Sequence, residues 1–171
     1  QIIKAARKHD IHLMGGPMLG NLSENGATIW LRPSTSKPLE VKVTTSNGNF
    51  EKSFVKNSVE PGMEQRIVLD GLAPDTKYNY AVYAGNRNSA EGSFTTASTT
   101  GGKGIFRIAF GSCFHKIGLH NPNLIHQILK SEPRAMMLLG DIAVDDRENQ
   151  INMHRADYLL RDVSKAWSEL A

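Results

Sequence analysis

Two residues whose side chains can bind metal ions each follow a short apolar run of the sequence. The first run, residues 106–110, ends three residues before Cys113, the only cysteine in the chain. The second run, residues 135–139, ends two residues before Asp141. A thiolate favours softer transition metals, whereas a carboxylate can bridge two ions. Two ions about 3.5–4 Å apart can activate hydroxide and stabilise both oxygens of a phosphoryl displacement. The two residue types are therefore suited to metal-assisted phosphoryl chemistry.

Both residues also have explanations that involve no metal. A lone cysteine is often a small buried hydrophobic residue, and an aspartate after a strand often caps the next turn. Cys113 could instead act as a covalent nucleophile, which requires a base and a thiol that ionises readily. His115 is the closest histidine in the sequence and is the candidate for a catalytic role. His120 follows in the same stretch, and either histidine could contact a substrate phosphate.

The elements that would position these residues follow from the apolar pattern in the second part of the chain. Both apolar runs are nearly continuous, as in strands that are covered on both faces. Between them, a helix is predicted to begin at Asn121, a natural N-cap that is followed by proline, and to end before Pro133. A second helix is predicted over residues 153–170. The residues expected on its apolar face are Ala156, Leu159, Leu160, Val163, Trp167 and Leu170.

The order strand, helix, strand, helix predicts a parallel, right-handed crossover unit. Ligands of open parallel sheets bind outside the carboxyl ends of the strands. Consecutive strands of such a unit are often neighbours, about 4.8 Å apart, or separated by one strand. We therefore expect Cys113 and Asp141 to lie at the same edge of the sheet, where they could share one ion or a pair of ions.

The first part of the chain has a different pattern. Short β-like runs between turn residues fill residues 13–97, and their spacing predicts an antiparallel β-sandwich of six or seven strands. Tyr78 lies where a tyrosine corner would place its hydroxyl near upstream backbone. Tyr80 and Trp30 are predicted, with Tyr78, to be core residues.

The predicted fold class is therefore multi-domain, with a β domain followed by an α/β domain. Residues 1–12 are expected to form an N-terminal extension, which we predict to be helical. Residues 13–97 form the β-sandwich, and residues 98–104 are a linker rich in Ser, Thr and Gly. Residues 105–171 are expected to be the first β-α-β-α portion of an α/β domain.

Composition limits the classes of function. The net charge of +3 comes from interleaved acids and bases, so nothing indicates nucleic-acid binding. No apolar stretch approaches the ~20 residues that span a bilayer, and one cysteine excludes an internal disulfide framework. The sequence starts at Gln1 without a signal peptide. We expect that the natural start, which could carry an export signal, is absent.

Three motifs resemble known families. The sequence "LLGD", which ends at Asp141, resembles the second motif of the calcineurin-like metallophosphoesterases. The sequence "FGSC", which ends at Cys113, resembles the alkaline phosphatase D family, in which this cysteine is a metal ligand. The corner around Tyr78 and the run "GSFTTA" resemble the fibronectin type III-like domain that precedes the catalytic domain in that family. Purple acid phosphatases are similar in layout, but they carry a carboxylate in the place of Cys113.

The resemblance implies a metal-dependent phosphomonoesterase or phosphodiesterase that acts through a metal-bound hydroxide. Cys113 and Asp141 would be metal ligands, with Asp141 bridging two ions of iron, calcium, zinc or manganese. The substrate would be a phosphate ester, either a small molecule or a lipid or polymer. Residues 13–97 would be the fibronectin type III-like domain, and residues 105–171 the start of the metallophosphoesterase domain. The family also implies export to the periplasm or the extracellular space.

The sequence departs from the family at two points. Val144 stands where the family commonly has a tyrosine that binds ferric iron, and Asp145 and Asp146 are acidic candidates nearby. The later motifs, which supply Asn, His and Asp ligands, are absent, and we therefore expect the opening part of a longer enzyme that is inactive alone. The alternative is a β-sandwich binding or adhesion module with a catalytically degenerate α/β segment.

Overall fold

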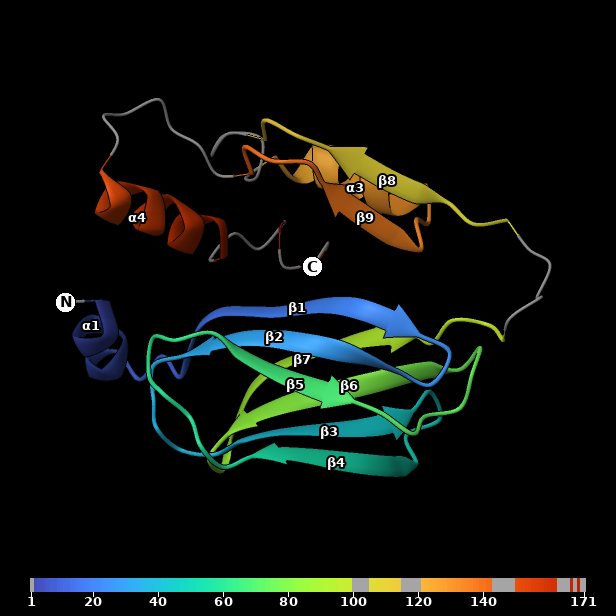
Figure 1. The fold of residues 1–171 in the computed structure, drawn as a ribbon, viewed down its shortest axis with the longest axis horizontal. Helices are drawn as coiled ribbons and strands as arrows, with labels where there is room; N and C mark the ends of the chain where they lie inside the picture. The colour runs from blue at the N-terminus through green and yellow to red at the C-terminus, as the bar shows by residue number, and fades with distance from the viewer. Residues whose placement is uncertain are drawn as a thin grey trace. The chain divides into compact units, whose positions relative to one another are not determined.

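The computed structural model describes residues 2–99, 105–114, 121–142 and 150–162, and residues 167 and 169. The chain divides into two compact units, Gln1–Gly102 and Lys103–Ala171 (Figure 1). Each unit has a hydrophobic cluster of its own. No helix among the described residues combines the length and the apolar character that a membrane span requires.

The first unit is an antiparallel β-sandwich, as predicted. Its described elements are helix α1 (Ile2–Lys8) and strands β1 (Leu13–Ser23), β2 (Gly26–Pro33), β3 (Leu39–Thr45), β4 (Phe50–Lys56), β5 (Gln65–Leu69), β6 (Lys77–Ala84) and β7 (Arg87–Thr95). One sheet has the strand order β1-β2-β5, and the other has the order β4-β3-β6-β7. All neighbouring strands in both sheets are antiparallel. The core lies between the two sheets.

Apolar residues at every second position build this core. Along β3, the fully buried side chains of Leu39, Val41 and Val43 alternate with the partly exposed Glu40 and Lys42. Successive side chains of a strand point to opposite faces of the sheet, so one face of β3 is buried in the core and the other faces solvent. Each fully buried Val or Leu side chain contributes about 1.5–3 kcal/mol relative to an exposed one.

The tyrosine corner is confirmed. The backbone N–H of Ala73 donates a hydrogen bond of 2.9 Å to the hydroxyl of Tyr78. The Tyr78 ring is buried and lies 5.8 Å from the ring of Phe94. Tyr80 is buried in the same core, as predicted. Burial raises the pKa of Tyr80 because the interior disfavours its charged form.

The prediction that Trp30 belongs to the core is wrong. Its neighbours Ile29 and Leu31 fill the inner face of β2, so the alternation of the strand directs Trp30 to the outer face, where it is half-buried. The guanidinium of Arg32 lies 5.3 Å from the centre of the Trp30 ring. A hydrogen bond from the Trp30 side chain lowers the pKa of Glu64, which favours its ionised form.

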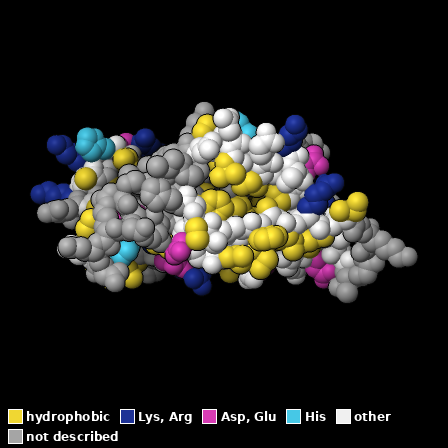
Figure 2. All heavy atoms as spheres, turned by 90° about the horizontal axis from the view of Figure 1, so that it is seen from above, with side chains coloured by type: hydrophobic (Ala, Val, Ile, Leu, Met, Phe, Trp, Pro, Cys, Tyr) yellow, Lys and Arg dark blue, Asp and Glu magenta, His cyan; other side chains and the backbone are white. Residues whose placement is uncertain are grey.

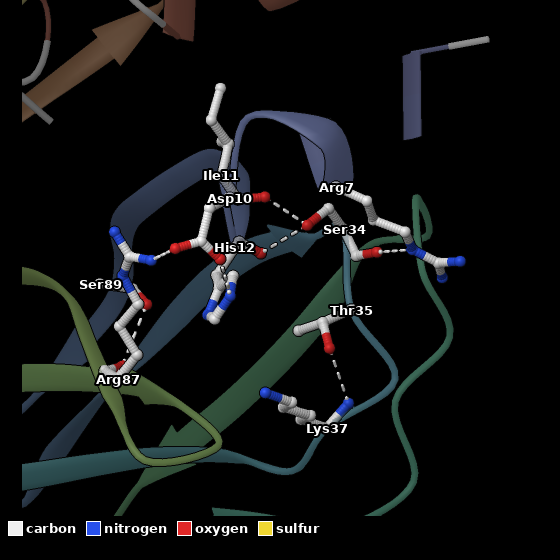
Figure 3. Close-up of polar contacts among 9 residues, drawn as sticks. All are labelled: Arg7, Asp10, Ile11, His12, Ser34, Thr35, Lys37, Arg87 and Ser89. Carbon is white, nitrogen blue, oxygen red and sulfur yellow. Dashed lines mark hydrogen bonds and ion pairs between the residues drawn. The ribbon is translucent and has the colours of Figure 1, made fainter. Parts of the chain in front are cut away.

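The segment around α1 is fastened to one end of the sandwich through Ser34 (Figure 3). Arg7 Nε donates a hydrogen bond of 2.9 Å to the carbonyl of Ser34. The backbone N–H of Ser34 donates to the carbonyl of His12 at 2.9 Å. The buried Ser34 hydroxyl donates to the carbonyl of Ile11. Ser34 thus satisfies backbone groups of the segment that enters β1.

A second polar contact ties the same segment to the turn between β6 and β7. The carboxylate of Asp10 contacts two side chains (Figure 3). One of its oxygens lies 3.0 Å from Nε2 of His12, and the other forms an ion pair with the guanidinium of Arg87. Asp10 itself has a left-handed backbone, with φ of 56°. Aspartate tolerates this conformation better than most residues. The segment before β1 is therefore part of the folded unit.

We predict that Ser34→Ala destabilises the chain by about 1–3 kcal/mol, because buried carbonyl groups would lose their hydroxyl donor. Thermal and urea unfolding would measure the change. The matched control is Ser36→Ala, at an exposed position in the same loop, where we expect less than about 0.5 kcal/mol. Equal effects of the two substitutions would contradict the anchoring role of Ser34.

Gly92 of β7 pairs with Tyr80 of β6, and the Tyr80 ring covers it. A methyl group at position 92 would lie 2.8 Å from Cε1 of the buried Tyr80 ring. We predict that Gly92→Ala costs about 1–3 kcal/mol, because the ring would have to move within a packed core. Gly20→Ala on β1 is the control, since a methyl group there meets no atom within 4 Å. Chemical denaturation of both variants measures the difference, and a neutral Gly92→Ala would contradict this packing.

The second unit holds a small parallel sheet and two described helices. Its elements are β8 (Ile108–Gly111), α3 (Pro122–Lys130), β9 (Ala135–Leu138) and α4 (Ile151–Asp162). The strands β8 and β9 run parallel, and Ile108 pairs with Ala135. The predicted cap of α3 is confirmed, because the side chain of Asn121 accepts hydrogen bonds from the N–H groups of Asn123 and Leu124.

The predicted apolar face of the second helix is confirmed at Trp167, which is buried, and wrong at Ala156. Ala156 is exposed, whereas Asp157 and Arg161 are buried. The guanidinium of Arg161 lies 5.2 Å from the centre of the Tyr158 ring and 5.4 Å from that of Trp167. A planar guanidinium stacks well on aromatic rings. These ring contacts accompany the burial of Arg161, a charged residue that the predicted apolar face does not include.

Candidate metal site at the ends of two parallel strands

The structure brings Cys113 and Asp141 together. The parallel register pairs Gly111 at the end of β8 with Leu138 at the end of β9, so both strands end at one edge of the sheet. Cys113 follows the first strand and Asp141 follows the second. Their side chains are adjacent, with 3.7 Å between Cys113 Sγ and Asp141 Oδ2. The expectation that the two residues meet at one sheet edge is confirmed.

Backbone hydrogen bonds continue past the strands and hold the two chain segments side by side. The N–H of Leu139 donates to the carbonyl of Gly111 at 2.9 Å. The N–H of Cys113 donates to the carbonyl of Gly140 at 3.3 Å, and the N–H of Phe114 donates to the carbonyl of Asp141 at 3.1 Å. Leu139 donates the first of these bonds, and the segment that contains Cys113 donates the other two. The separation of the two side chains is therefore set by the backbone.

Both candidate ligands have an uncommon backbone conformation. Cys113 has φ of 56° and Asp141 has φ of 49°, which is the left-handed region. Aspartate enters this region several times more often than most residues, whereas a cysteine there is uncommon. Such conformations cost about 1–3 kcal/mol and cluster at functional sites. The conformation turns both side chains toward the same space beyond the strand ends.

Close packing supports this arrangement from one side. Gly111 precedes the turn, and a methyl group there would lie 2.8 Å from Cζ of the Phe114 ring. Phe114, Leu138 and Ile142 in turn pack against the buried side chain of Trp167. The strand ends thus rest on an apolar cluster, while Cys113 and Asp141 remain exposed.

The two donor atoms fit a shared metal ion. Bonds of about 2.3 Å to sulfur and 2.1 Å to oxygen at a tetrahedral angle place the two donors about 3.6 Å apart. The distance of 3.7 Å between Sγ and Oδ2 agrees with this value. Without an ion, the thiol donates a weak hydrogen bond to the carboxylate at the same distance. Among the described residues, no three His, Cys, Asp or Glu side chains form a metal-binding group.

The other predicted site residues lie outside the described residues. His115 and His120 fall in residues 115–120, and Val144, Asp145 and Asp146 fall in residues 143–149. The candidate site described here therefore consists of Cys113 and Asp141. What sequence reasoning missed is the left-handed backbone at both positions. The glycine that precedes Asp141 and the Gly-Ser pair that precedes Cys113 were the available signals of a sharp turn.

Comparison with known proteins identifies the first unit. The profile of one family, described as a domain of unknown function (DUF7800), matches residues 10–95, which is half of the chain. The chain belongs to the DUF7800 family. The DUF7800 match spans all seven strands of the sandwich and ends at the last residue of β7. Cys113 and Asp141 lie beyond the part that defines this family.

A solved structure extends the likeness to both units. The structure of PhoD matches 92% of this chain with a TM-score of 0.73 and 15% sequence identity. At this identity, the match establishes a shared fold. The matched region covers 37% of the PhoD chain, so this DUF7800 chain spans little more than a third of that structure.

Other solved structures resemble only part of the chain. The sensor domain of the anti-sigma factor RsgI4 in Pseudobacteroides cellulosolvens is 14% identical, and the match covers 52% of this chain and 76% of that one, with a TM-score of 0.40. The central fibronectin-III array of RIM-binding protein is 27% identical, and the match covers 53% and 32% of the two chains, with a TM-score of 0.33. No curated protein matches the sequence significantly.

We predict that Cys113→Gly keeps or raises the stability of the chain. Glycine relieves a left-handed conformation that costs an ordinary residue about 1–2 kcal/mol, against about 0.5–1 kcal/mol of added chain entropy. Cys113→Val is the contrasting variant, which we expect to lose about 1–3 kcal/mol because a β-branched residue is strained there. Denaturant unfolding compares them, and a large loss in Cys113→Gly would contradict the inferred strain.

Proposed function

We propose that the protein is a metal-dependent hydrolase of phosphoric esters in which Cys113 and Asp141 bind metal ions. The observation that carries the proposal is the meeting of a thiol and a carboxylate, 3.7 Å apart, beyond the ends of two parallel strands. The fold shared with PhoD supports it, because the motifs at these two residues resemble those of the alkaline phosphatase D family. The left-handed backbone at Cys113 and Asp141 also supports the proposal, because energetically costly backbone conformations cluster at functional sites.

The two residues have different roles in this proposal. Cys113 would hold one ion through its thiolate, and the carboxylate of Asp141 would help to hold that ion and a second one, the metal being iron, zinc, manganese or calcium. Bound metal ions supply Lewis-acid activation of water and neutralise charge on the phosphoryl group. Both side chains are exposed, so a phosphate ester can reach this edge of the sheet. His115 and Asp145 remain the candidates for further polar groups.

The remaining parts of the proposal concern the protein as a whole. Residues 105–171 are proposed to be the first part of a metallophosphoesterase domain, and the DUF7800 sandwich to be its fibronectin type III-like companion. The substrate is proposed to be a phosphomonoester or phosphodiester, either a small molecule or a lipid or polymer, and the protein to be exported. Since a dinuclear centre requires more than two protein ligands, this chain alone is expected to bind metal weakly and to turn over little substrate.

Cobalt titration of this chain tests the proposed ligands directly. Co²⁺ bound to a thiolate gives a charge-transfer band in the near ultraviolet. We predict that the band forms in the unmodified chain, disappears in Cys113→Ser, and requires at least about tenfold more Co²⁺ in Asp141→Asn. Asp75→Asn is the matched control, because Asp75 is also an exposed aspartate with a left-handed backbone, φ of 46°. It should leave the titration unchanged.

Two results would contradict the proposal. If Asp141→Asn and Asp75→Asn require the same Co²⁺ concentration to form the band, Asp141 is not a metal ligand. Full metal content in Cys113→Ser, measured by elemental analysis of the natural full-length protein, would remove Cys113. Hydrolysis of p-nitrophenyl phosphate and bis-p-nitrophenyl phosphate by that protein then tests the reaction itself. If protein stripped of metal hydrolyses neither ester after iron, zinc, manganese or calcium ions are added back, the result would favour the binding-module alternative.

A further inference from the structure

One face of the small parallel sheet is apolar and exposed. Ile108 and Phe110 of β8 are 48% and 73% exposed, and Met137 of β9 is 52% exposed. The register pairs Phe110 with Met137 and Ile108 with Ala135, so these side chains lie on the same face. Seen from above, hydrophobic side chains gather over the β8–β9 region (Figure 2). We call these four residues the outer face of the β8–β9 sheet.

The apolar pattern continues beyond the strand ends. Phe106, two residues before β8, and Leu139, directly after β9, are 65% and 59% exposed. The other face of the sheet is different, because Ala109, Met136 and Leu138 are half-buried. Leu138 packs against Trp167. The sheet therefore has one face that is partly covered and one that is open.

Two strands of the DUF7800 sandwich carry a different type of residue on their outer faces. On the outer face of β3, the alternate residues are Glu40 and Lys42, and on that of β6 they include Lys77 and Asn79. On these two strands the outer faces carry polar side chains, although Val55 of β4 and Val68 of β5 are exposed apolar residues elsewhere on the DUF7800 sandwich. The outer face of β8–β9 carries no polar side chain. A sheet that is apolar on both faces is typical of parallel sheets, which occur almost only where both faces are covered.

We propose that the outer face of the β8–β9 sheet is the packing surface for a further α/β layer of the same domain. The occupant is the polypeptide that corresponds to the part of PhoD outside the shared region, since that region is only 37% of the PhoD chain. Helices that cover such a face present an apolar stripe to it. A two-stranded parallel sheet also has little core of its own and needs such a partner. The proposal is independent of the metal site.

Cysteine labelling tests the proposal. In a Cys113→Ser background, Phe110→Cys and Met137→Cys place a thiol on the outer face, and Val68→Cys, at a 61% exposed position of β5, is the control. Each variant is made in this chain and in the natural full-length protein, and the rate of reaction with a maleimide is measured. In this chain, we expect all three thiols to react at similar rates. In the full-length protein, we expect the two outer-face thiols to react at least about 100-fold more slowly, as buried groups do.

The other outcomes overturn the proposal. Fast labelling of all three thiols in the full-length protein would mean that the face is open to water. Slow labelling of Phe110→Cys in this chain, with a dimer detected by light scattering, would identify a second copy as the occupant. Slow labelling in a monomer of this chain would mean that residues already present cover the face. Circular dichroism of each variant verifies that the fold is kept.

Discussion

The parallel pairing of β8 with β9 is the constraint on which the candidate site depends. The two strands end at the same edge, and backbone bonds that continue past them hold Cys113 beside Asp141. Neither the thiol nor the carboxylate is held by burial, since both are exposed. The geometry of the pair therefore comes from the backbone. In a site of this kind the side chains stay accessible to ions and substrate, and hydrogen bonds between main-chain groups hold the two segments together.

The two units of the chain solve the problem of stability in different ways. The DUF7800 sandwich buries alternate residues of two sheets in one core, and the outer face of β3 carries the polar residues Glu40 and Lys42. The second unit has a four-residue pairing of two strands and a small cluster around Trp167. It also carries strained turns and an open apolar face. Left-handed backbone at ordinary residues persists where the surrounding structure holds it in place, and a contiguous exposed apolar patch marks a surface that contacts a partner.

Much of the architecture could be predicted, and the errors have a common cause. An antiparallel sandwich of six or seven strands, the tyrosine corner at Tyr78 and the capped helix after Asn121 were predicted from local patterns, and the structure has seven sandwich strands among the described residues. Trp30 was assigned to the core because aromatic residues are often buried, and Ala156 was assigned to a buried face because it falls on the apolar stripe of the predicted helix. Trp30 is half-buried because Ile29 and Leu31 occupy the inner face of β2, and Ala156 is exposed while Asp157 and Arg161 of the same helix are buried. Whether a side chain is buried depends on which other side chains fill the same part of the core, and a local sequence pattern does not contain that information.

The sequence by itself determined which residues can do chemistry and which elements carry them. Cys113 and Asp141 follow apolar runs, and the alternation and capping signals that define those elements act over a few residues. Only the tertiary structure decided that the thiol and the carboxylate lie 3.7 Å apart and that both have left-handed backbones. It also decided which face of the β8–β9 sheet stays open. These properties depend on the pairing of segments about 28 residues apart in the chain, and such pairing is a result of folding that no local signal encodes.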